Sequence, residues 1–410
     1  MKSRYLIAVL SMVTISLMAS ASLSSEPSKI PEETLYRNEL ARSINSFSFA
    51  TFKKMCASEQ GNLFISPLSI SYALGMTCNG ASGSTRSEMK DVLMYSELSD
   101  AELNMGYMAL IRYLENLDPD VSLAIANSIW YNSDFTLKQE FIQQNKRAFE
   151  AEIDGLDFSR PSSVDRINDW VADNTNGKIE QIVSPPLSPD MVLFLINAVY
   201  FNGTWQEKFD PARTREEPFY LADGDTLRWK MMNQTVDHGY LLGDTYQSVD
   251  LGYGDGNYRM ALFVPHDTIA VGSFVADFNQ EFWQNWLSGR NHGEVILTLP
   301  RIKLSYSKIL NDILIAMGIK RAFSAQMAEF DKISDQDIFI DQVLHKTFVQ
   351  VDEKGTEAAA ATSVGMALSA APMNKPVTIR VDRPYVFTIY EVETETILFM
   401  GKVMQPVWEE

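Results

Sequence analysis

Hydrophobic residues recur at helical spacing through most of the first half of the chain. Apolar positions three and four residues apart predict amphipathic helices. The expected helices cover residues 31–54, 67–76, 87–93, 100–117, 137–149 and 163–174, with a further one at 308–317 among later strands. Ser66 followed by Pro67 is typical of a helix start, because serine caps free N–H groups and proline fits the first turn.

Strand patterns dominate from residue 191 onward. Residues 191–201 form a nearly unbroken apolar run, which is typical of a strand buried on both faces. Other predicted strands cover 121–130, 246–251, 258–264, 295–299, 377–381, 385–390 and 396–402, and a glycine-rich turn at 252–256 predicts a hairpin. The chain has no internal repeat and no linker rich in proline or serine. We therefore expect one α+β domain, with helices first and large mixed sheets later.

The first 21 residues have the pattern of a secretory signal peptide. Lys2 and Arg4 precede an apolar run at 5–18, and Ala19-Ser20-Ala21 supplies the small residues of a cleavage site. About 14 apolar residues are too few to span a bilayer, which needs roughly 20. The sequence therefore predicts removal of residues 1–21 and secretion of a single domain at 22–410, into the extracellular space or into the periplasm of a bacterial producer.

The composition excludes several classes of function. A 46% hydrophobic and 21% charged chain is an ordinary globular protein rather than a disordered one. Its 53 acidic and 35 basic residues give a formal charge of −18, which repels nucleic acid. The two cysteines, Cys56 and Cys78, are too few for a disulfide scaffold, and we expect both to be free. None of the four histidines has a second ligand at metal-binding spacing, so no metal or cofactor is expected.

No motif of a catalytic site stands out. The chain lacks the Gly-x-Ser-x-Gly turn of the common hydrolases. Its glycine-rich segment at 80–85 lacks the lysine and the preceding strand of a phosphate-binding loop. We therefore expect no catalytic residues in this chain. A hydrolase with a dispersed Ser-His-Asp triad is the weakest alternative.

One long segment is unusual. Residues 355–371 contain no proline and no cation, although loops of this length normally depend on proline, asparagine and aspartate. If the segment is extended, its even-numbered face from Thr356 to Leu368 is small or apolar at every step, as in a strand that can be buried in a sheet. Its alanines equally favour a helix. A segment that suits loop, helix and strand is a candidate conformational switch.

This segment carries a specific resemblance. Residues 351–362 (VDEKGTEAAAAT) are similar to the hinge of the reactive-centre loop in serpins. Four other blocks match the family in order and approximate spacing: residues 62–70 (NLFISPLSI), 197–205 (NAVYFNGTW), 299–301 (LPR) and 399–403 (FMGKV) followed by Pro406. Five ordered motifs between Leu35 and Pro406 identify the chain as a member of this family.

The resemblance implies a fold of about nine helices packed on three β-sheets, with an exposed reactive-centre loop at about 353–376. It also implies a suicide inhibitor of serine proteases, which forms a covalent complex when the cleaved loop inserts into the central sheet before the acyl-enzyme is hydrolysed. The alternative within the family is a non-inhibitory carrier or chaperone. Such relatives usually have bulky residues in the hinge, whereas this hinge is small and uncharged after Glu357.

Three groups of residues follow from the resemblance. The hinge comprises Gly355, Thr356, Glu357, Ala358, Ala359, Ala360, Ala361 and Thr362. The shutter, a buried polar cluster beneath the strands that must part, comprises Ser66, Ser69, Asn197 and His345; without the resemblance, His345 would be read as an ordinary core histidine. The breach, where insertion begins, comprises Trp205, Arg301 and Glu353, the last two as an ion pair.

The scissile bond follows from family spacing. Counting from Gly355 places it between Ser369 and Ala370, with cuts after Leu368, Met366 or Met373 as alternatives. Every candidate is small, aliphatic or a thioether, so we expect elastase-, subtilisin- or chymotrypsin-like targets, with papain-like cysteine proteases open through Leu368. Heparin activation is not expected, because the helix at 100–117 carries a single cation, Arg112. We expect a monomer with neither a nucleic-acid nor a membrane partner.

Overall fold

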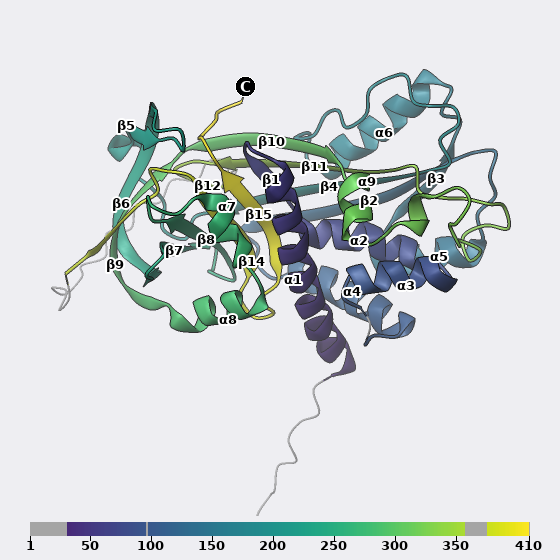
Figure 1. The fold of residues 1–410 in the computed structure, drawn as a ribbon, viewed down its shortest axis with the longest axis horizontal. Helices are drawn as coiled ribbons and strands as arrows, with labels where there is room; N and C mark the ends of the chain where they lie inside the picture. The colour runs from purple at the N-terminus through teal and green to yellow at the C-terminus, as the bar shows by residue number, and fades with distance from the viewer. Residues whose placement is uncertain (1–30, 96, 357–374, 410) are drawn as a thin grey trace, which may run out of the picture.

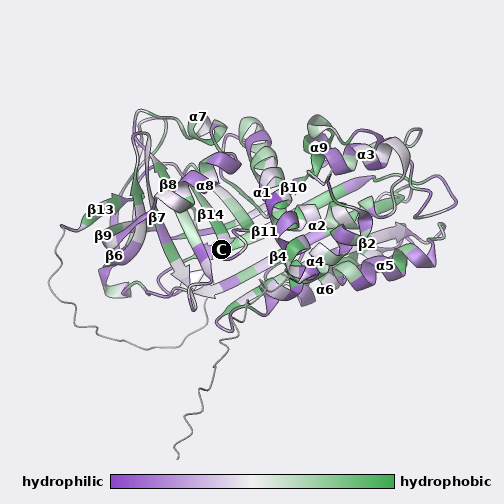
Figure 2. Ribbon diagram, turned by 90° about the horizontal axis from the view of Figure 1, so that it is seen from below, coloured by the Kyte–Doolittle hydropathy of each residue, from purple (hydrophilic) through white to green (hydrophobic). Residues whose placement is uncertain are grey.

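The computed structural model describes residues 31–95, 97–356 and 375–409. Nine α-helices lie within these ranges: α1 Glu32–Ser58, α2 Pro67–Cys78, α3 Gly83–Val92, α4 Asp100–Glu115, α5 Gln139–Phe149, α6 Pro161–Asn174, α7 Val271–Ala276, α8 Gln280–Gly289 and α9 Asn311–Met317. Ser66 caps α2, since its side chain accepts a hydrogen bond from the Ser69 N–H, and Pro67 fills the first turn. In Figure 2 the helices carry hydrophobic and hydrophilic bands, as their sequence periodicity predicts. No helix in these ranges combines the length and the apolar character needed to cross a membrane.

The strands form two hydrogen-bonded sheets within the described ranges. They are β1 Leu63–Ile65, β2 Val121–Asn132, β3 Glu152–Leu156, β4 Leu193–Thr204, β5 Arg215–Tyr220, β6 Thr226–Leu242, β7 Tyr246–Tyr253, β8 Tyr258–Pro265, β9 Asn291–Pro300, β10 Ile302–Ile309, β11 Gln342–Val351, β12 Gly355–Thr356, β13 Val377–Arg380, β14 Tyr385–Glu391 and β15 Ile397–Val403. The α+β class is confirmed. The resemblance implies three sheets; here β6 pairs with both β7 and β9 and so joins two of them into one network of nine strands.

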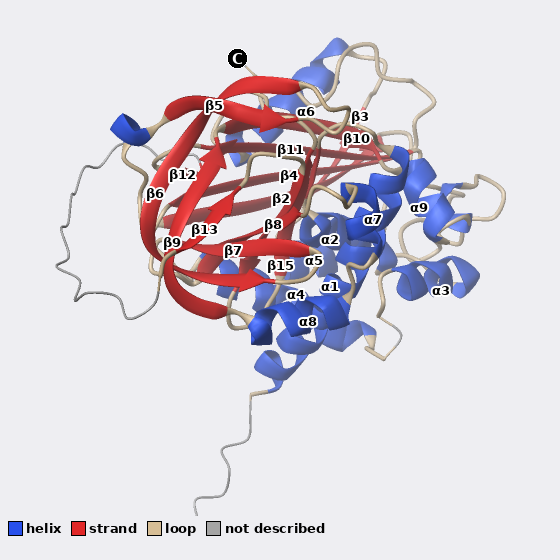
Figure 3. Ribbon diagram, turned by 60° about the vertical axis from the view of Figure 1, so that its left-hand side comes forward, coloured by secondary structure: helices blue, strands red, loops and turns tan. Residues whose placement is uncertain are grey.

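The six-stranded sheet is the one that bears on function. Its order is β10-β11-β12-β4-β2-β3, and β11 also pairs directly with β4 (Figure 3). As its apolar run predicts, β4 is buried on both faces. Phe194, Ile196 and Ala198 pack in a cluster with residues of α6, whereas Leu195 and Val199 belong to the main core, which includes α2. The sheet therefore lies between two layers, and any change in it must be accommodated on both sides (Figure 1).

The nine-stranded sheet packs beside the first one. Eight of its strands follow the order β1-β15-β14-β8-β7-β6-β9-β13, and the ninth, β5, pairs with β6 off this path. The predicted hairpin is confirmed by the pairing of Tyr253 with Tyr258 across β7 and β8. Aromatic rings of α7 and α8 cover this sheet, including Phe274 and Trp286 against Phe263. Every residue of β14 and β15 is buried, so this sheet supplies a large part of the core.

Several elements differ from the prediction. Lys308 and Ile309 end strand β10 instead of opening a helix, and α9 begins at Asn311. The pattern around Lys308 suits either structure, and the ladder to His345 and Leu344 of β11 decides for the strand. Strands β1, β3, β5, β6, β10 and β11 and helices α7 and α8 were not predicted. In β6, buried and exposed positions follow no strict alternation, because different parts of the strand pair with β5, β7 and β9.

Candidate functional site

The first two hinge residues already lie inside the six-stranded sheet. Gly355 and Thr356 form β12, which pairs antiparallel with β4 at Thr204 and Gly203 and with β11 at Val351. Strands β4 and β11 run parallel to each other, and their direct ladder covers only 194–199 with 342–347. One end of the seam between β4 and β11 is therefore parted by the hinge, whereas the other end is closed.

Only glycine fits at position 355. Its φ of +155° lies in a region that favours glycine. A Cβ atom there would lie 2.1 Å from the Gly203 carbonyl oxygen and 2.8 Å from the Thr204 Cα. Because both contacts are to backbone, neither can be relieved by a rotamer change, and the chain enters the sheet only without a side chain here.

Thr356 fixes which face of the hinge points inward. Its side chain is buried, and its Oγ1 lies 2.5 Å from the Tyr253 hydroxyl. Tyr253 in turn stacks on Trp205, with ring centroids 4.4 Å apart and planes within 13°. The even-numbered face of the hinge therefore starts toward the core, as the sequence pattern predicts.

The predicted breach residues meet around the chain that leads into β12. Trp205 donates a hydrogen bond from its indole Nε1 to the Asp352 carbonyl at 2.8 Å, and its backbone N–H donates to the Lys354 carbonyl. Arg301 donates from Nε and Nη2 to one carboxylate oxygen of Glu353, at 2.8 and 2.5 Å. The Thr214 hydroxyl donates to the same oxygen. With Glu353 4% exposed, the ion pair is mostly desolvated and anchors residue 353.

The four predicted shutter residues form one buried hydrogen-bond network. His345 Nδ1 lies 2.7 Å from Asn197 Oδ1, directly across the ladder between β11 and β4. Asn197 Nδ2 donates to the Ser69 carbonyl at 3.0 Å and also to the Ser69 hydroxyl. The Ser66 hydroxyl donates to the Leu398 carbonyl at 2.7 Å. The network thus ties the closed part of the seam to the start of α2 and to the nine-stranded sheet.

The hydrogen bonds fix the protonation state of His345. Its Nε2 accepts from the Ser66 backbone N–H at 3.1 Å, and a backbone N–H can only donate. The proton of the neutral ring is therefore on Nδ1, where it is donated to Asn197. Burial lowers the pKa of His345 to about 3, because the charged ring would be desolvated with no carboxylate to compensate. The shutter is consequently a neutral network at physiological pH.

Sequence reasoning missed one member of this network, Asn127, and a second buried polar side chain, Thr347, two residues from His345. Asn127 on β2 accepts a hydrogen bond from Asn197 at 2.6 Å, and the two are register partners. Thr347 on β11 donates from its hydroxyl to the Phe64 carbonyl at 2.6 Å. Both are polar residues in otherwise apolar strand sequences. Because buried polar side chains need hydrogen-bond partners, this pattern could have identified them from the sequence.

The rest of the predicted loop lies outside the described residues. This holds for Glu357, Ala358, Ala359, Ala360, Ala361 and Thr362 of the hinge, and for Met366, Leu368, Ser369, Ala370 and Met373 around the scissile bond. It also holds for the signal peptide at 1–21. Cys56 and Cys78 are described, and both are free and buried, as predicted.

The part of the chain that the structure describes also bears on metal binding and on glycosylation. It contains no group of three or more His, Cys, Asp or Glu residues that could hold a metal ion. The chain has two Asn-x-Thr sequences of the kind that accept N-linked sugars, at Asn202 and Asn233. Both amides are engaged: Asn202 Nδ2 donates to the Tyr200 hydroxyl at 2.9 Å, and Asn233 Nδ2 donates to Glu217 at 3.0 Å. The organised polar sites of the parted seam are thus the breach and the shutter.

Comparisons with known proteins agree with this geometry. A family model described as serpin (serine protease inhibitor) matches residues 42–406. The chain belongs to the serpin family. This serpin is 36% identical over 377 residues to an uncharacterized serpin-like protein of Thermococcus kodakarensis, a match that covers 90% of this chain and 86% of the relative.

Two solved structures of serpins illustrate the range of the family. The thermophilic serpin tengpin, in its native state, is 30% identical with a TM-score of 0.82, and the match covers 90% of this chain and 94% of that one. Human thyroxine-binding globulin in complex with its hormone is 26% identical with a TM-score of 0.84, over 91% of this chain and 100% of that one. Serpins are typically protease inhibitors rather than enzymes, and some of the relatives are carriers.

Proposed function

We propose that this serpin is a secreted suicide inhibitor of serine endopeptidases, which traps the acyl-enzyme by inserting its cleaved loop between β4 and β11. The observation that carries the proposal is the position of β12. A strand antiparallel to two parallel neighbours already occupies one end of the seam. Insertion of more of the loop would lengthen β12, so no new strand would have to start between β4 and β11.

Continuing the register of β12 matches the loop to the sheet. On that register Glu357 would lie opposite Asn202, and Met366 would lie opposite Leu193, the first residue of β4. A cut after Met366, Leu368, Ser369 or Met373 would therefore leave enough chain to cover β4 from end to end. Each added residue would exchange the direct β4–β11 ladder for two new ladders, and the gain in strand pairing supplies the driving force.

On the same register Thr362 would lie at the shutter. It would lie opposite Asn197 when counted along β4 and opposite His345 when counted along β11. Insertion would thus break the hydrogen bond between these two side chains and offer them a hydroxyl, which can both donate and accept. The replacement keeps the buried network satisfied, as a buried network requires.

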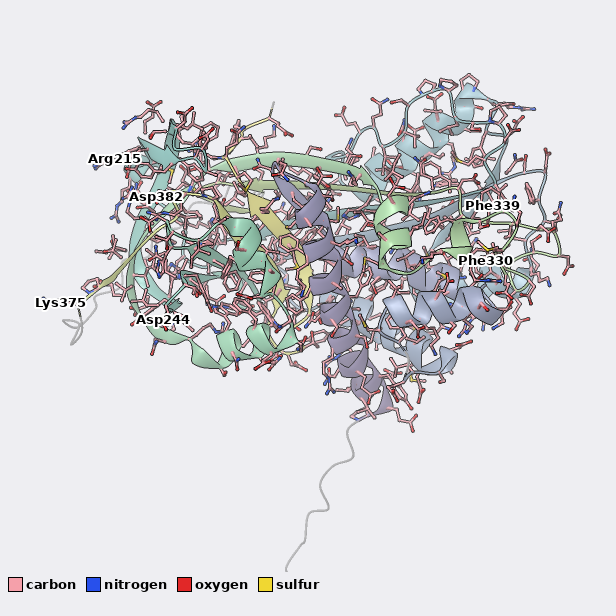
Figure 4. The ribbon with its side chains drawn as sticks, in the orientation of Figure 1. Arg215, Asp244, Phe330, Phe339, Lys375 and Asp382 are labelled. Atoms are coloured by element: carbon pink, nitrogen blue, oxygen red, sulfur yellow. The ribbon has the colours of Figure 1, made fainter. Side chains whose placement is uncertain are left out.

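The described ends of the loop support its role as bait. The described chain stops at Thr356 within the sheet and resumes at Lys375, which Figure 4 shows at the left-hand edge of the molecule beside β13. The bond after Ser369 lies in the segment that connects them. A small or aliphatic residue before the cut favours elastase-, subtilisin- or chymotrypsin-like enzymes, and Leu368 also suits papain-like ones.

The carrier alternative has less support. A glycine at position 355 is needed for entry into the sheet, and an inward-facing Thr356 and the neutral shutter suit a sheet that opens. Removal of residues 1–21 and export would bring the inhibitor to extracellular or periplasmic proteases.

The test mixes purified protein of residues 22–410 with pancreatic elastase and with subtilisin, followed by denaturing electrophoresis and intact-mass analysis. We expect a covalent band and a released fragment that begins at Ala370. A fragment that begins after Leu368 or Met373 would move the scissile bond and keep the inhibitor. Complete cleavage without a covalent band, and without a rise in the thermal unfolding midpoint afterwards, would contradict loop insertion and favour the carrier.

A further inference from the structure

A large cavity lies apart from the seam, where the end of α1 meets the nine-stranded sheet. Its volume is about 890 Å³, within the range of small-molecule sites. Most of the surface that it offers is apolar, and its walls include Tyr220, Leu221, Pro265, Ile269, Pro384 and Met404. Tyr220 is 47% exposed at the rim, so the cavity is open to solvent from that side.

A buried lysine is among the residues that line this cavity. Lys402 on β15 is only 4% exposed, yet no carboxylate of the described residues lies within ion-pair distance of its Nζ. Its hydrogen-bond acceptor is the backbone carbonyl of Glu59, at the C-terminal end of α1. The partial negative charge of a helix C-terminus compensates part of a full charge. A buried cation normally has a formal counter-charge as well.

The carboxylates near the cavity are engaged elsewhere or exposed. Glu59 pairs with Lys308 at 2.5 Å, and Asp382 pairs with Arg383 at 3.2 Å. Asp267 is exposed at the rim. The cavity therefore combines a mostly apolar wall with Lys402 as a buried cation that lacks an acid.

The remaining polar groups of the wall, which include Arg383, His266 and Cys56, carry no negative charge. His266 lies with Nε2 3.1 Å from the Gly243 carbonyl, so this nitrogen carries a proton that it donates. Burial raises the pKa of the Cys56 thiol to about 12, which keeps it protonated. Neither group supplies the missing negative charge.

We propose that this cavity binds an amphipathic organic carboxylate, with the carboxylate on Lys402 and an apolar body against the wall from Leu221 to Met404. The ligand class follows from the two features together. An apolar molecule without charge would leave Lys402 uncompensated, and a small inorganic anion would leave the apolar wall uncovered. None of the residues that line the cavity belongs to β4, β11 or β12, so it is a second binding function of the chain.

The test is a fluorescence titration of the protein of residues 22–410 with 11-(dansylamino)undecanoate, with dodecanoate and methyl dodecanoate as competitors. We expect saturable binding of one molecule per chain, displaced by the acid and far less by the ester. Lys402→Met keeps the volume and removes the charge, and we expect it to weaken binding about tenfold to a hundredfold. Lys54→Met, the same change at an exposed position on α1, is the matched control and should leave binding unchanged.

A second variant tests the cavity without touching the charge. Gly272 lines it, and an added Cβ there meets no atom within 4 Å, so Gly272→Phe places a ring in open space. We expect this variant to abolish binding while its unfolding midpoint and covalent trapping of protease stay as in the parent. Equal displacement by acid and ester, or unchanged affinity in both variants, would overturn the proposal. Trapping is measured separately, so its failure would leave this result unaffected.

Discussion

The two ends of the seam between β4 and β11 are in different states. At the breach, Gly355 and Thr356 separate the strands and are anchored by the ion pair of Glu353 with Arg301. At the shutter, the strands pair directly and a neutral hydrogen bond joins Asn197 to His345. The end that is open is anchored by charge, whereas the end that is closed is held by a network whose members can change partners. On the mechanism that we propose, the difference predicts that insertion starts readily at the breach and meets its main barrier at the shutter.

The largest expected effect comes from placing a charge on the inward face of the hinge. On the register of β12, Ala358 would lie between Phe201 and Val349, which are both buried. Ala358→Arg should abolish trapping and turn the protein into a substrate, because burying the unpaired charge costs several kcal/mol. The yield of covalent complex with elastase measures this.

Its control is one residue away. Glu357 would lie between Asn202 and Gln350, both half-buried, and is charged already. Glu357→Arg should therefore keep most of the trapping. Equal loss in both variants would show that the hinge does not enter with the register of β12.

A smaller effect is expected from the shutter on acidification. The pKa of His345 is about 3 in the fold and near 6.5 in the unfolded chain, so the unfolded state takes up the proton first. The contribution of neutral His345 to the free energy of unfolding is therefore complete above pH 6.5. It falls by about 1.4 kcal/mol per pH unit as the pH decreases toward 3. His345→Gln removes this loss, and urea unfolding at pH 6 and pH 4.5 measures it.

His238 serves as an internal reference for that experiment. Burial, with Arg259 and His292 nearby, lowers its pKa to about 4, and it remains in the variant. The variant should therefore lose less stability on acidification than the parent while still losing some. Identical losses in parent and variant would mean that His345 is charged in the fold, which contradicts the tautomer derived from Ser66.

The smallest effect is expected at the breach. Trp205→Phe removes the donor to the Asp352 carbonyl and weakens the stack on Tyr253, a cost of about 1–3 kcal/mol in the free energy of unfolding. Because residues 352–356 are then held less tightly, the rate of loop insertion after cleavage should also change. Trp170→Phe on α6 is the matched control. If it changed the rate of loop insertion as much as Trp205→Phe does, the breach would have no particular influence on insertion.

Many helices and strands of this protein could be predicted from short stretches of its sequence. Apolar periodicity predicted the helices from α1 to α6, the doubly buried β4 and the hairpin of β7 and β8, because these patterns depend on neighbouring residues. Family motifs identified the shutter and breach residues, which the structure brings together. The sequence did not reveal β1, β3, β5, β6, β10, β11, α7 or α8; in β6 and β11 burial is set by partners far along the chain.

What only the tertiary structure decided is where the polar residues meet. Asn127, Asn197 and His345 are 70 and 148 residues apart in sequence, and the strand order places them in one row. The proton on His345 Nδ1 depends on the Ser66 N–H from a different element, and the missing counter-ion of Lys402 depends on how Glu59 and Lys308 pair. Periodicity determines which faces are buried, because it is a property of the local chain. Hydrogen bonds and charges across a sheet depend on register, which is fixed only when distant strands pair.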